Sequence, residues 1–361
     1  MSFRMASKPD FIMAAPDDRI GDHFEHQAMA CDRLGSPFTG SLCRALTRVL
    51  DDTTHTGRRV LSWPGNPRWD ALALRLCGGL HGLVLTGADA ALSAVYPPSE
   101  ADEDALVAVL PGAIARNDAV LSTALDSAPQ TNETARSAML LPGFLTIARE
   151  TGLQLALNEI GSSAGLNMLF DRFHYAYGDI CWGDALSGAR LTPEVTGRLP
   201  LLHGALEILT RQGCDIAPVD LTDEAARLRL RSYVWADQTD RLKRLDAAIA
   251  IAKRVEFSVE TMNAAAFLRR QLAAHKEGAA FVLFHSIMWQ YMSEREREDI
   301  RHLLKTAGRN ATSAAPIAWL RMEAVAVADP FATLSLTLWP GGETRRLARC
   351  DFHGRSIEWL G

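Results

Sequence analysis

The chain has 361 residues, of which 48% are hydrophobic and 22% charged, and these proportions are typical of a globular protein with a sizeable core. A net charge of −5 gives no electrostatic basis for binding nucleic acid or an anionic membrane, so we expect neither as a partner. No apolar run reaches the roughly 18 residues of a membrane-spanning helix. Six scattered cysteines without a C-x-x-C pair argue against a metal site and favour a cytoplasmic location.

The first part of the chain has helical periodicity after a polar start. Residues 1–18 have no apolar core followed by a cleavage site, so we interpret them as a disordered lead-in. Apolar positions then recur at helical spacing in four blocks, over residues 20–52, 67–96, 105–125 and 133–151. No alternating strand pattern competes with them. Residues 19–150 are therefore predicted to form a helical domain.

A polar insert at residues 129–133 precedes the last of these helices. Thr131 or Asn132 as a helix N-cap accounts for much of it. The functional alternative is a loop that closes over a ligand site, with Gln130, Asn132 and Glu133 contacting a small-molecule substrate.

The most informative stretch is residues 153–167, which read LQLALNEIGSSAGLN. An apolar run predicts a strand buried on both faces, and Glu159 follows it. A loop of very small residues from Gly161 to Gly165 comes next, and helical spacing resumes after it. Such a loop lets a backbone approach a ligand beneath a helix N-terminus. The alternative is a turn whose small residues only permit tight packing.

The second half alternates between predicted strands and helices. Residues 175–213 fit no simple unit, although 199–210 look helical. Buried-type strands follow at residues 214–221, 255–259, 279–284 and 316–320, and two closing strands at 334–338 and 356–360 suggest a hairpin. We therefore predict an α/β fold, with a mostly parallel sheet covered by helices on both faces and an antiparallel pair at its edge.

Ligands of such sheets bind at the carboxyl ends of the strands. The predicted strand ends bring polar residues to one rim, namely Glu159 with its loop, Asp220, Asn263, His285 and Ser286.

This pattern resembles the class I S-adenosylmethionine-dependent methyltransferases, whose first motif is acid-x-Gly-x-Gly-x-Gly. Glu159, Gly161 and Gly165 match the motif, and Ser163 stands where the middle glycine would be. The resemblance covers residues 151–361. It implies a Rossmann-like methyltransferase-type domain, S-adenosylmethionine as cofactor and a small or medium-sized methyl acceptor.

The resemblance also implies roles for the rim. The methionine part of the cofactor would lie against the first strand end and its loop, comprising Glu159, Gly161, Ser162, Ser163 and Gly165. Asp220 would hold the ribose hydroxyls and Asn263 would face adenine. His285 and Ser286 would meet the substrate, with His285 orienting or deprotonating the acceptor.

The chain also looks like a mainly bacterial family described only as a domain of unknown function. The stretches that carry this likeness are PQTNE, NEIGSSAGLNMLFDRFHYAYGD, DLTD with YVWADQTDRL, and FVLFHS. This likeness extends from the helical part to the C-terminus, but the family has no established activity, so it gives no information on the reaction.

Several alternatives stay open. Asp220 lies far beyond the usual distance of about 20 residues after the loop, so either residues 175–213 are an insertion or Asp179 is the ribose acid. His285 fits a buried structural histidine as well as a catalytic one.

Two other functions compete with methyl transfer. One is a non-catalytic protein of the same fold that binds a nucleotide-like ligand or a partner. The other is a serine hydrolase, because GSSAG places Ser163 at the nucleophile position of a G-x-S-x-G elbow, with Asp351 and His353 further along the chain.

Overall fold

The computed structural model describes residues 20–130, 132–326 and 329–361. The expected lead-in over residues 1–18 and the proposed cap Thr131 lie outside these described residues. The chain divides into two compact units. The helical unit comprises the described residues of 10–131 together with 222–243, and the α/β unit comprises those of 132–221 and 244–361.

The helical unit is built from short helices around an apolar core. The helices from its first segment are α1 (Ile20–Arg33), α2 (Pro37–Val49), α3 (His55–Leu61), α4 (Leu72–Thr86), α5 (Ala90–Ser93), α6 (Glu103–Arg116) and α7 (Asp118–Ala124). Leucines at helical spacing, such as Leu42, Leu46, Leu76 and Leu80, are buried together in this core. The helical periodicity of the sequence is thereby explained by one shared apolar interior.

A later segment of the chain completes the helical unit. It contributes α9 (Glu224–Ser232) and the beginning of α10 (Thr239–Ala252). The ring of Tyr233 lies so close to α4 that a Cβ on Gly78 would be 2.6 Å from it. Asp237 accepts hydrogen bonds from the Ser36 hydroxyl and from the Phe38 N–H. The YVWADQTD stretch is therefore a packing and capping element of this unit.

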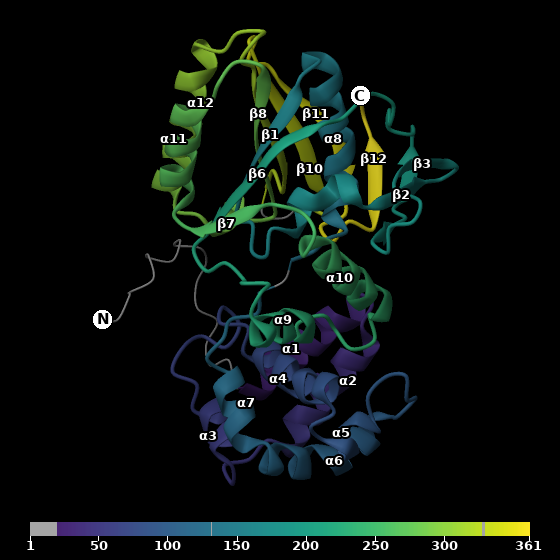
Figure 1. The fold of residues 1–361 in the computed structure, drawn as a ribbon. Helices are drawn as coiled ribbons and strands as arrows, with labels where there is room; N and C mark the ends of the chain where they lie inside the picture. Colours follow the sequence, from purple (N-terminus) through teal and green to yellow (C-terminus); the bar gives the residue numbers. More distant parts are fainter. Residues whose placement is uncertain (1–19, 131, 327–328) are drawn as a thin grey trace. The chain divides into compact units, whose positions relative to one another are not determined.

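The α/β unit contains one large, mostly parallel sheet (Figure 1). Within the described residues it has nine strands in the order β5-β12-β11-β10-β9-β8-β1-β6-β7. The parallel strands at its centre are β1 (Gln154–Ile160), β6 (Ile208–Asp215), β7 (Ser258–Thr261), β8 (Ala279–Ser286) and β9 (Ile317–Glu323). The antiparallel strands are β10 (Ala332–Trp339), β11 (Thr344–Cys350) and β12 (Ser356–Trp359), and β5 (Glu194–Gly197) pairs parallel to β12. The predicted mixed α/β fold is confirmed.

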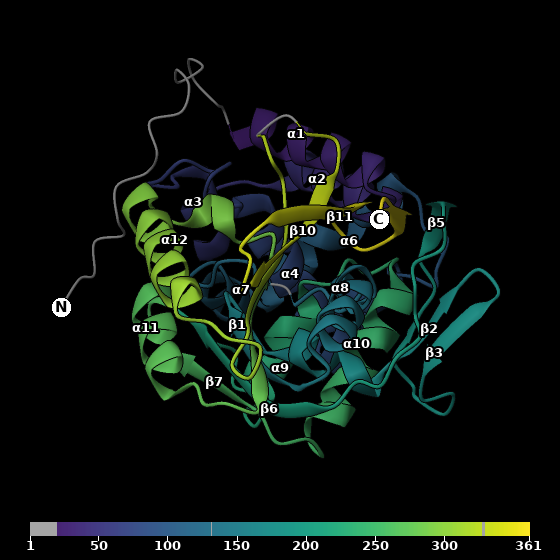
Figure 2. The ribbon, with the colours of Figure 1, turned by 90° about the horizontal axis from the view of Figure 1, so that it is seen from above.

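Helices cover both faces of the central strands, as Figure 2 shows. On one face α8 (Arg136–Thr151) places Phe144 against Phe284, with ring centroids 5.0 Å apart. On the other face α11 (Ala264–Ala274) and α12 (Glu294–Arg309) bury Phe267 and Leu304 against the sheet. Because both faces are covered, every residue of β8 is buried, which explains its continuous apolar run.

The region of residues 175–213 departs from the prediction. β2 (His174–Tyr177), β3 (Ile180–Gly183) and β4 (Arg190–Leu191) form a separate sheet, and β5 adds to the edge of the large one. The helix predicted at 199–210 and the strand predicted at 214–221 are wrong, because β6 ends at Asp215. This strand is polar and half-exposed, so its pairing with β1 and β7 leaves no apolar signature. After the glycine loop, the predicted helix is a short 3₁₀ helix, η1 (Leu166–Arg172).

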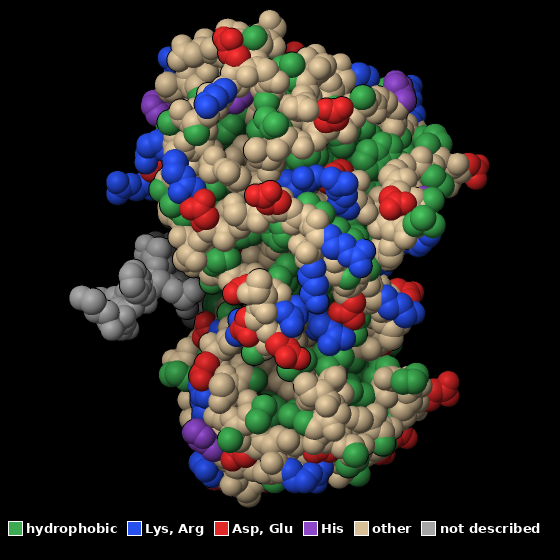
Figure 3. All heavy atoms as spheres, in the orientation of Figure 1, with side chains coloured by type: hydrophobic (Ala, Val, Ile, Leu, Met, Phe, Trp, Pro, Cys, Tyr) green, Lys and Arg blue, Asp and Glu red, His purple; other side chains and the backbone are tan. Residues whose placement is uncertain are grey.

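No single helix among the described residues is long and apolar enough to cross a membrane; only α6 and α7 taken together, bent by 93°, reach that length and composition. On the face drawn in Figure 3, acidic and basic side chains are interspersed over each unit, in keeping with the small net charge.

Candidate functional site

The carboxyl ends of β1 and β6 form the candidate site. The central strands stand in the order β7-β6-β1-β8-β9, so successive connections run outward in opposite directions from β1. Open α/β sheets bind ligands at such a reversal, outside the carboxyl ends of the strands, and here the reversal lies between β1 and β8, beside the candidate site. Glu159 lies at this end of β1, and Ile160 is paired with Cys214, the residue before Asp215. The fold therefore brings two carboxylates to the same point.

The loop after β1 has three residues in the left-handed conformation. The φ angles are 67° at Gly161, 52° at Ser163 and 73° at Gly165. Ser163 thus adopts the backbone conformation that glycine favours, at the position where the methyltransferase motif has glycine. A Cβ on Gly161 would lie 2.9 Å from Met288, and one on Gly165 would lie 2.7 Å from Val259. The two glycines are required for close packing within the protein.

Most loop N–H groups already have partners. The Ser162 N–H donates to the Cys214 carbonyl at 3.1 Å, and the Ser163 N–H donates to Asp215 Oδ2 at 2.8 Å. The Leu166 N–H donates to Asn132 Oδ1 at 2.9 Å. The loop is therefore held by protein contacts, and these three N–H groups are not aimed at a ligand.

Two polar side chains at the loop are buried without a partner among the described residues. Glu159 is 2% exposed and its Oε2 has no hydrogen bond, and the buried Ser163 Oγ likewise has none. Burial, reinforced by the negative charge of Asp215, raises the pKa of the Glu159 carboxyl well above its usual range, against an opposing effect of Arg136. Buried polar atoms normally have partners, so these two atoms are exceptions that lie together at the end of β1.

Asp215 is the acidic residue at the end of the second strand of the parallel series. Its Oδ2 accepts from Ser163 and its Oδ1 accepts from the Ala217 N–H at 2.9 Å. The sequence prediction assigned this position to Asp220, which lies five residues beyond the strand and is exposed. The misplacement of the strand end caused the error. No local pattern in the sequence marks Asp215, because β6 is polar and half-exposed.

Asn263 caps α11 at the end of β7. Its Oδ1 accepts from the Ala266 N–H at 3.0 Å, and its Nδ2 donates to Glu296 Oε1 at 2.6 Å. Both ends of the amide are thus occupied by protein groups. The expected contact of Asn263 with adenine gains no support from this geometry.

His285 is fully buried and hydrogen-bonded through both ring nitrogens. Its Nδ1 lies 2.6 Å from Glu323 Oε1, and Trp319 Nε1 donates to its Nε2 at 3.1 Å. An indole N–H is only a donor, so Nε2 carries no proton and His285 is the neutral tautomer with its proton on Nδ1. This is the buried structural histidine that the sequence left open. With its basic nitrogen occupied, His285 does not present a base to a substrate.

Glu323 was missed by the sequence prediction although it organises this region. Besides His285, the same Oε1 accepts from the N–H groups of Met288 and Trp289. It thereby fixes the segment after β8, where Ile287 has a φ of 52°. A β-branched residue in this conformation is strained. Ser286 is 8% exposed, and its carbonyl accepts from Arg136.

The polar insert is divided between the two units. Gln130 belongs to the helical unit, whereas Asn132 and Glu133 belong to the α/β unit. Asn132 holds the end of the glycine loop through Leu166, and Glu133, 3% exposed, accepts from the Ala135 N–H at 3.1 Å. These contacts of Asn132 and Glu133 are structural.

The geometry does not support a serine hydrolase. An activated serine needs a base within hydrogen-bond reach, and the Ser163 Oγ has no hydrogen-bond partner among the described residues. Asp351 accepts from the backbone N–H of His353 and pairs with Arg355. Burial opposes ionisation of the Asp351 carboxyl, but the hydrogen bonds from Arg355 and His353, with the positive charge of Arg355, lower its pKa.

The chain belongs to a family of uncharacterised proteins conserved in bacteria, DUF2332, whose sequence pattern matches residues 21–359. This confirms the resemblance to a bacterial family of unknown function. No curated protein matches the chain, and no solved structure matches it.

Proposed function

We propose that this member of the DUF2332 family binds an adenosine-containing ligand, with S-adenosylmethionine as the candidate, and transfers its methyl group to a small or medium-sized molecule. The observation that carries the proposal is the meeting of Glu159, Ser163 and Asp215 at the carboxyl ends of β1 and β6. Taken in chain order, the five parallel strands read 3-2-1-4-5, the order of doubly wound nucleotide-binding sheets.

The donor and acceptor groups of the site fit such a ligand. Ribose hydroxyls donate hydrogen bonds, and each carboxylate oxygen of Asp215 keeps acceptor capacity beyond its one backbone contact. The unpartnered Oε2 of Glu159 suits an amino group, because a cation beside it would favour the ionised carboxylate. The Ser163 hydroxyl adds a donor at the same place.

The chain's own residues would act by binding and positioning. Bound S-adenosylmethionine supplies an electrophilic methyl group, so the protein needs chiefly to hold an acceptor in line with it. His285 is neutral and occupied on both nitrogens, so it would stabilise the strand ends and would not remove a proton.

Calorimetric titration with S-adenosylhomocysteine tests the proposal. We expect binding to the wild-type protein, about tenfold weaker binding for Asp215→Asn because one charged acceptor is lost, and no change for Asp220→Asn. A matching thermal shift should appear, since ligand at about 100 times its Kd stabilises by roughly 2.7 kcal/mol.

Three results would contradict the proposal. They are no binding to folded protein, equal binding by Asp215→Asn and, for the assignment of S-adenosylmethionine and methyl transfer, preferential binding of NAD or ATP. Circular dichroism checks that both variants are folded.

A non-catalytic binding protein is the second candidate. It is favoured by the loop N–H groups that the protein itself satisfies and by the occupied nitrogens of His285. Binding of S-adenosylhomocysteine without transfer of label from methyl-labelled S-adenosylmethionine to any of a panel of amines, thiols and hydroxyl compounds would support it.

A further inference from the structure

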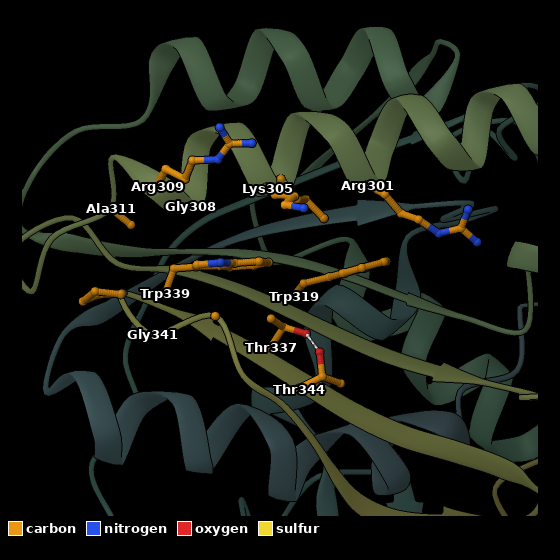
Figure 4. A pocket seen from close by; sticks show the side chains of 13 residues that line it. Arg301, Lys305, Gly308, Arg309, Ala311, Trp319, Thr337, Trp339, Gly341 and Thr344 are labelled. Carbon is orange, nitrogen blue, oxygen red and sulfur yellow. Dashed lines mark hydrogen bonds between the residues drawn. The ribbon is translucent and has the colours of Figure 1, made fainter.

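A cavity of about 520 Å³ lies between α12 and the strands β9 and β10 of the α/β unit (Figure 4). Trp319 is near the start of β9, and Trp339 ends the antiparallel β10 opposite Ile317. The cavity is therefore at the amino ends of the parallel strands. It shares no lining residue with the site around Glu159 and Asp215.

Two tryptophans are the largest apolar residues of the lining, and both are held in place. A Cβ on Gly308 would lie 2.6 Å from the Trp339 ring, so the absence of a side chain there admits the indole against α12. The Trp319 indole is fixed by its hydrogen bond to His285, which Glu323 orients in turn. Figure 4 shows the two rings beside each other beneath the helix. Such rigid rings are suited to contact with a planar ligand.

The charged residues of the lining are Arg301, Lys305 and Arg309, and no acidic residue of the described chain belongs to it. Arg301 and Lys305 are four residues apart on α12 and so share a face of the helix, on the side of the tryptophans in Figure 4. Arg301 pairs with Glu294 at 3.0 Å, whereas no carboxylate in the described chain pairs with Lys305.

A further cation lies beside the cavity. The Arg321 guanidinium sits 3.9 Å from the centre of the Trp319 ring and donates to Thr337 Oγ1 at 3.2 Å. Burial, with a smaller effect of the positive charge of Arg301, lowers the pKa of Arg321 to about 10. Of the three cations Arg301, Lys305 and Arg321, only Arg301 has a paired carboxylate among the described residues, and this excess of positive charge favours an anionic ligand.

We propose that this cavity binds a small anion that carries a planar ring, of the nucleoside monophosphate class. Arg301 and Lys305 hold the phosphate, and the ring lies along Trp319 and Trp339. The hydroxyls of Thr337 and Thr344, which lie beside the ring, are hydrogen-bonded to each other at 2.7 Å (Figure 4). The volume is within the range of about 300–1,000 Å³ that small-molecule sites occupy. This site is independent of the one proposed for methyl transfer.

Calorimetric titration with AMP tests the proposal on the full chain. We expect binding by the wild-type protein and about tenfold weaker binding by Arg301→Gln/Lys305→Gln, which loses two charged donors. Ala311→Phe keeps every charge but fills the cavity, and it should weaken binding as strongly. Arg295→Gln, an exposed change on the same helix away from the cavity, is the matched control and should bind as the wild type does.

Further titrations show which parts of AMP are recognised and which of the two sites binds it. Adenosine and inorganic phosphate should each bind more weakly than AMP, because each lacks one half of the recognised ligand. Asp215→Asn should leave AMP binding unchanged. The proposal is overturned if folded wild-type protein does not bind AMP, if the cavity variants bind it normally, or if Asp215→Asn alone abolishes binding. Tighter binding of a single-stranded oligonucleotide than of AMP would also overturn it.

Discussion

The two ends of the parallel strands differ in charge and in openness. At the carboxyl ends, the acidic residues Glu159 and Asp215 meet at a loop whose N–H groups are largely satisfied by the protein. At the other end, the cavity beneath α12 is basic and lined by two tryptophans. The site at Glu159 and Asp215 is thus formed by tightly packed backbone, whereas the site beneath α12 is a cavity lined by side chains. A glycine-rich loop by itself does not show where a protein has room for a ligand.

One chain of hydrogen bonds connects the two regions. Glu323 lies at the carboxyl end of β9 and holds His285, and His285 accepts from Trp319 in the wall of the cavity. A change in this chain therefore affects both ends of the strands, whereas a change in the loop tests the carboxyl end alone.

The largest effect is expected for Glu323→Ala. The change removes the acceptor for buried His285 Nδ1–H and for two backbone N–H groups. Each buried donor left without an acceptor typically costs about 1–3 kcal/mol of unfolding free energy, and three donors lose theirs. Urea denaturation measures it, and Glu323→Gln, which keeps an acceptor oxygen, should lose clearly less. Equal losses would contradict the role assigned to this acceptor.

A smaller effect is expected for Gly165→Ala, which tests how tightly the loop is packed. The new Cβ would be strained by the left-handed φ and would meet Val259, Met168 and Phe257 at 2.7 to 2.9 Å. We expect a loss of about 3 kcal/mol, combining backbone strain with overpacking.

Gly152→Ala is the matched control for this change. Gly152 has a similar φ of 66°, but no atom lies within 4 Å of the place that a Cβ would take, so only the strain of about 1–2 kcal/mol applies. Similar losses for the two variants would show that the loop has room to spare.

The smallest effect is expected for Glu159→Gln and depends on pH. The pKa of Glu159 is raised in the folded protein, so the folded state keeps a proton that the unfolded state releases above its ordinary pKa of 4.5. The protonated Glu159 carboxyl therefore contributes fully to the free energy of unfolding below pH 4.5. This contribution is lost as the pH rises from 4.5 to the pKa of the group in the folded protein. The variant should therefore match the wild type near pH 4 and become relatively more stable towards pH 8. Thermal midpoints across this range measure the difference, and a constant difference would contradict it.

The local patterns predicted well what depends on neighbouring residues. The buried strands β1 and β8, the helices of the first 130 residues and the loop at Gly161–Gly165 all have continuous apolar or small-residue signatures. Ser163 has a φ of 52°, a conformation that glycine adopts more easily, so the small-residue loop is strained at this position.

The sequence alone determined the α/β class, the central strand with its glycine loop and the acid Glu159, because burial on both faces imposes a hydrophobic period that a single segment displays. Only the tertiary structure decided the rest. β6 is recognisable only by its pairing with β1. The end of this strand could therefore not be located in the sequence, and Asp215 could not be chosen over Asp220. The protonation of His285 depends on Glu323 and Trp319 from another strand, and the basic cavity joins α12 to β9 and β10. These features arise from contacts between distant segments, and no local pattern encodes such contacts.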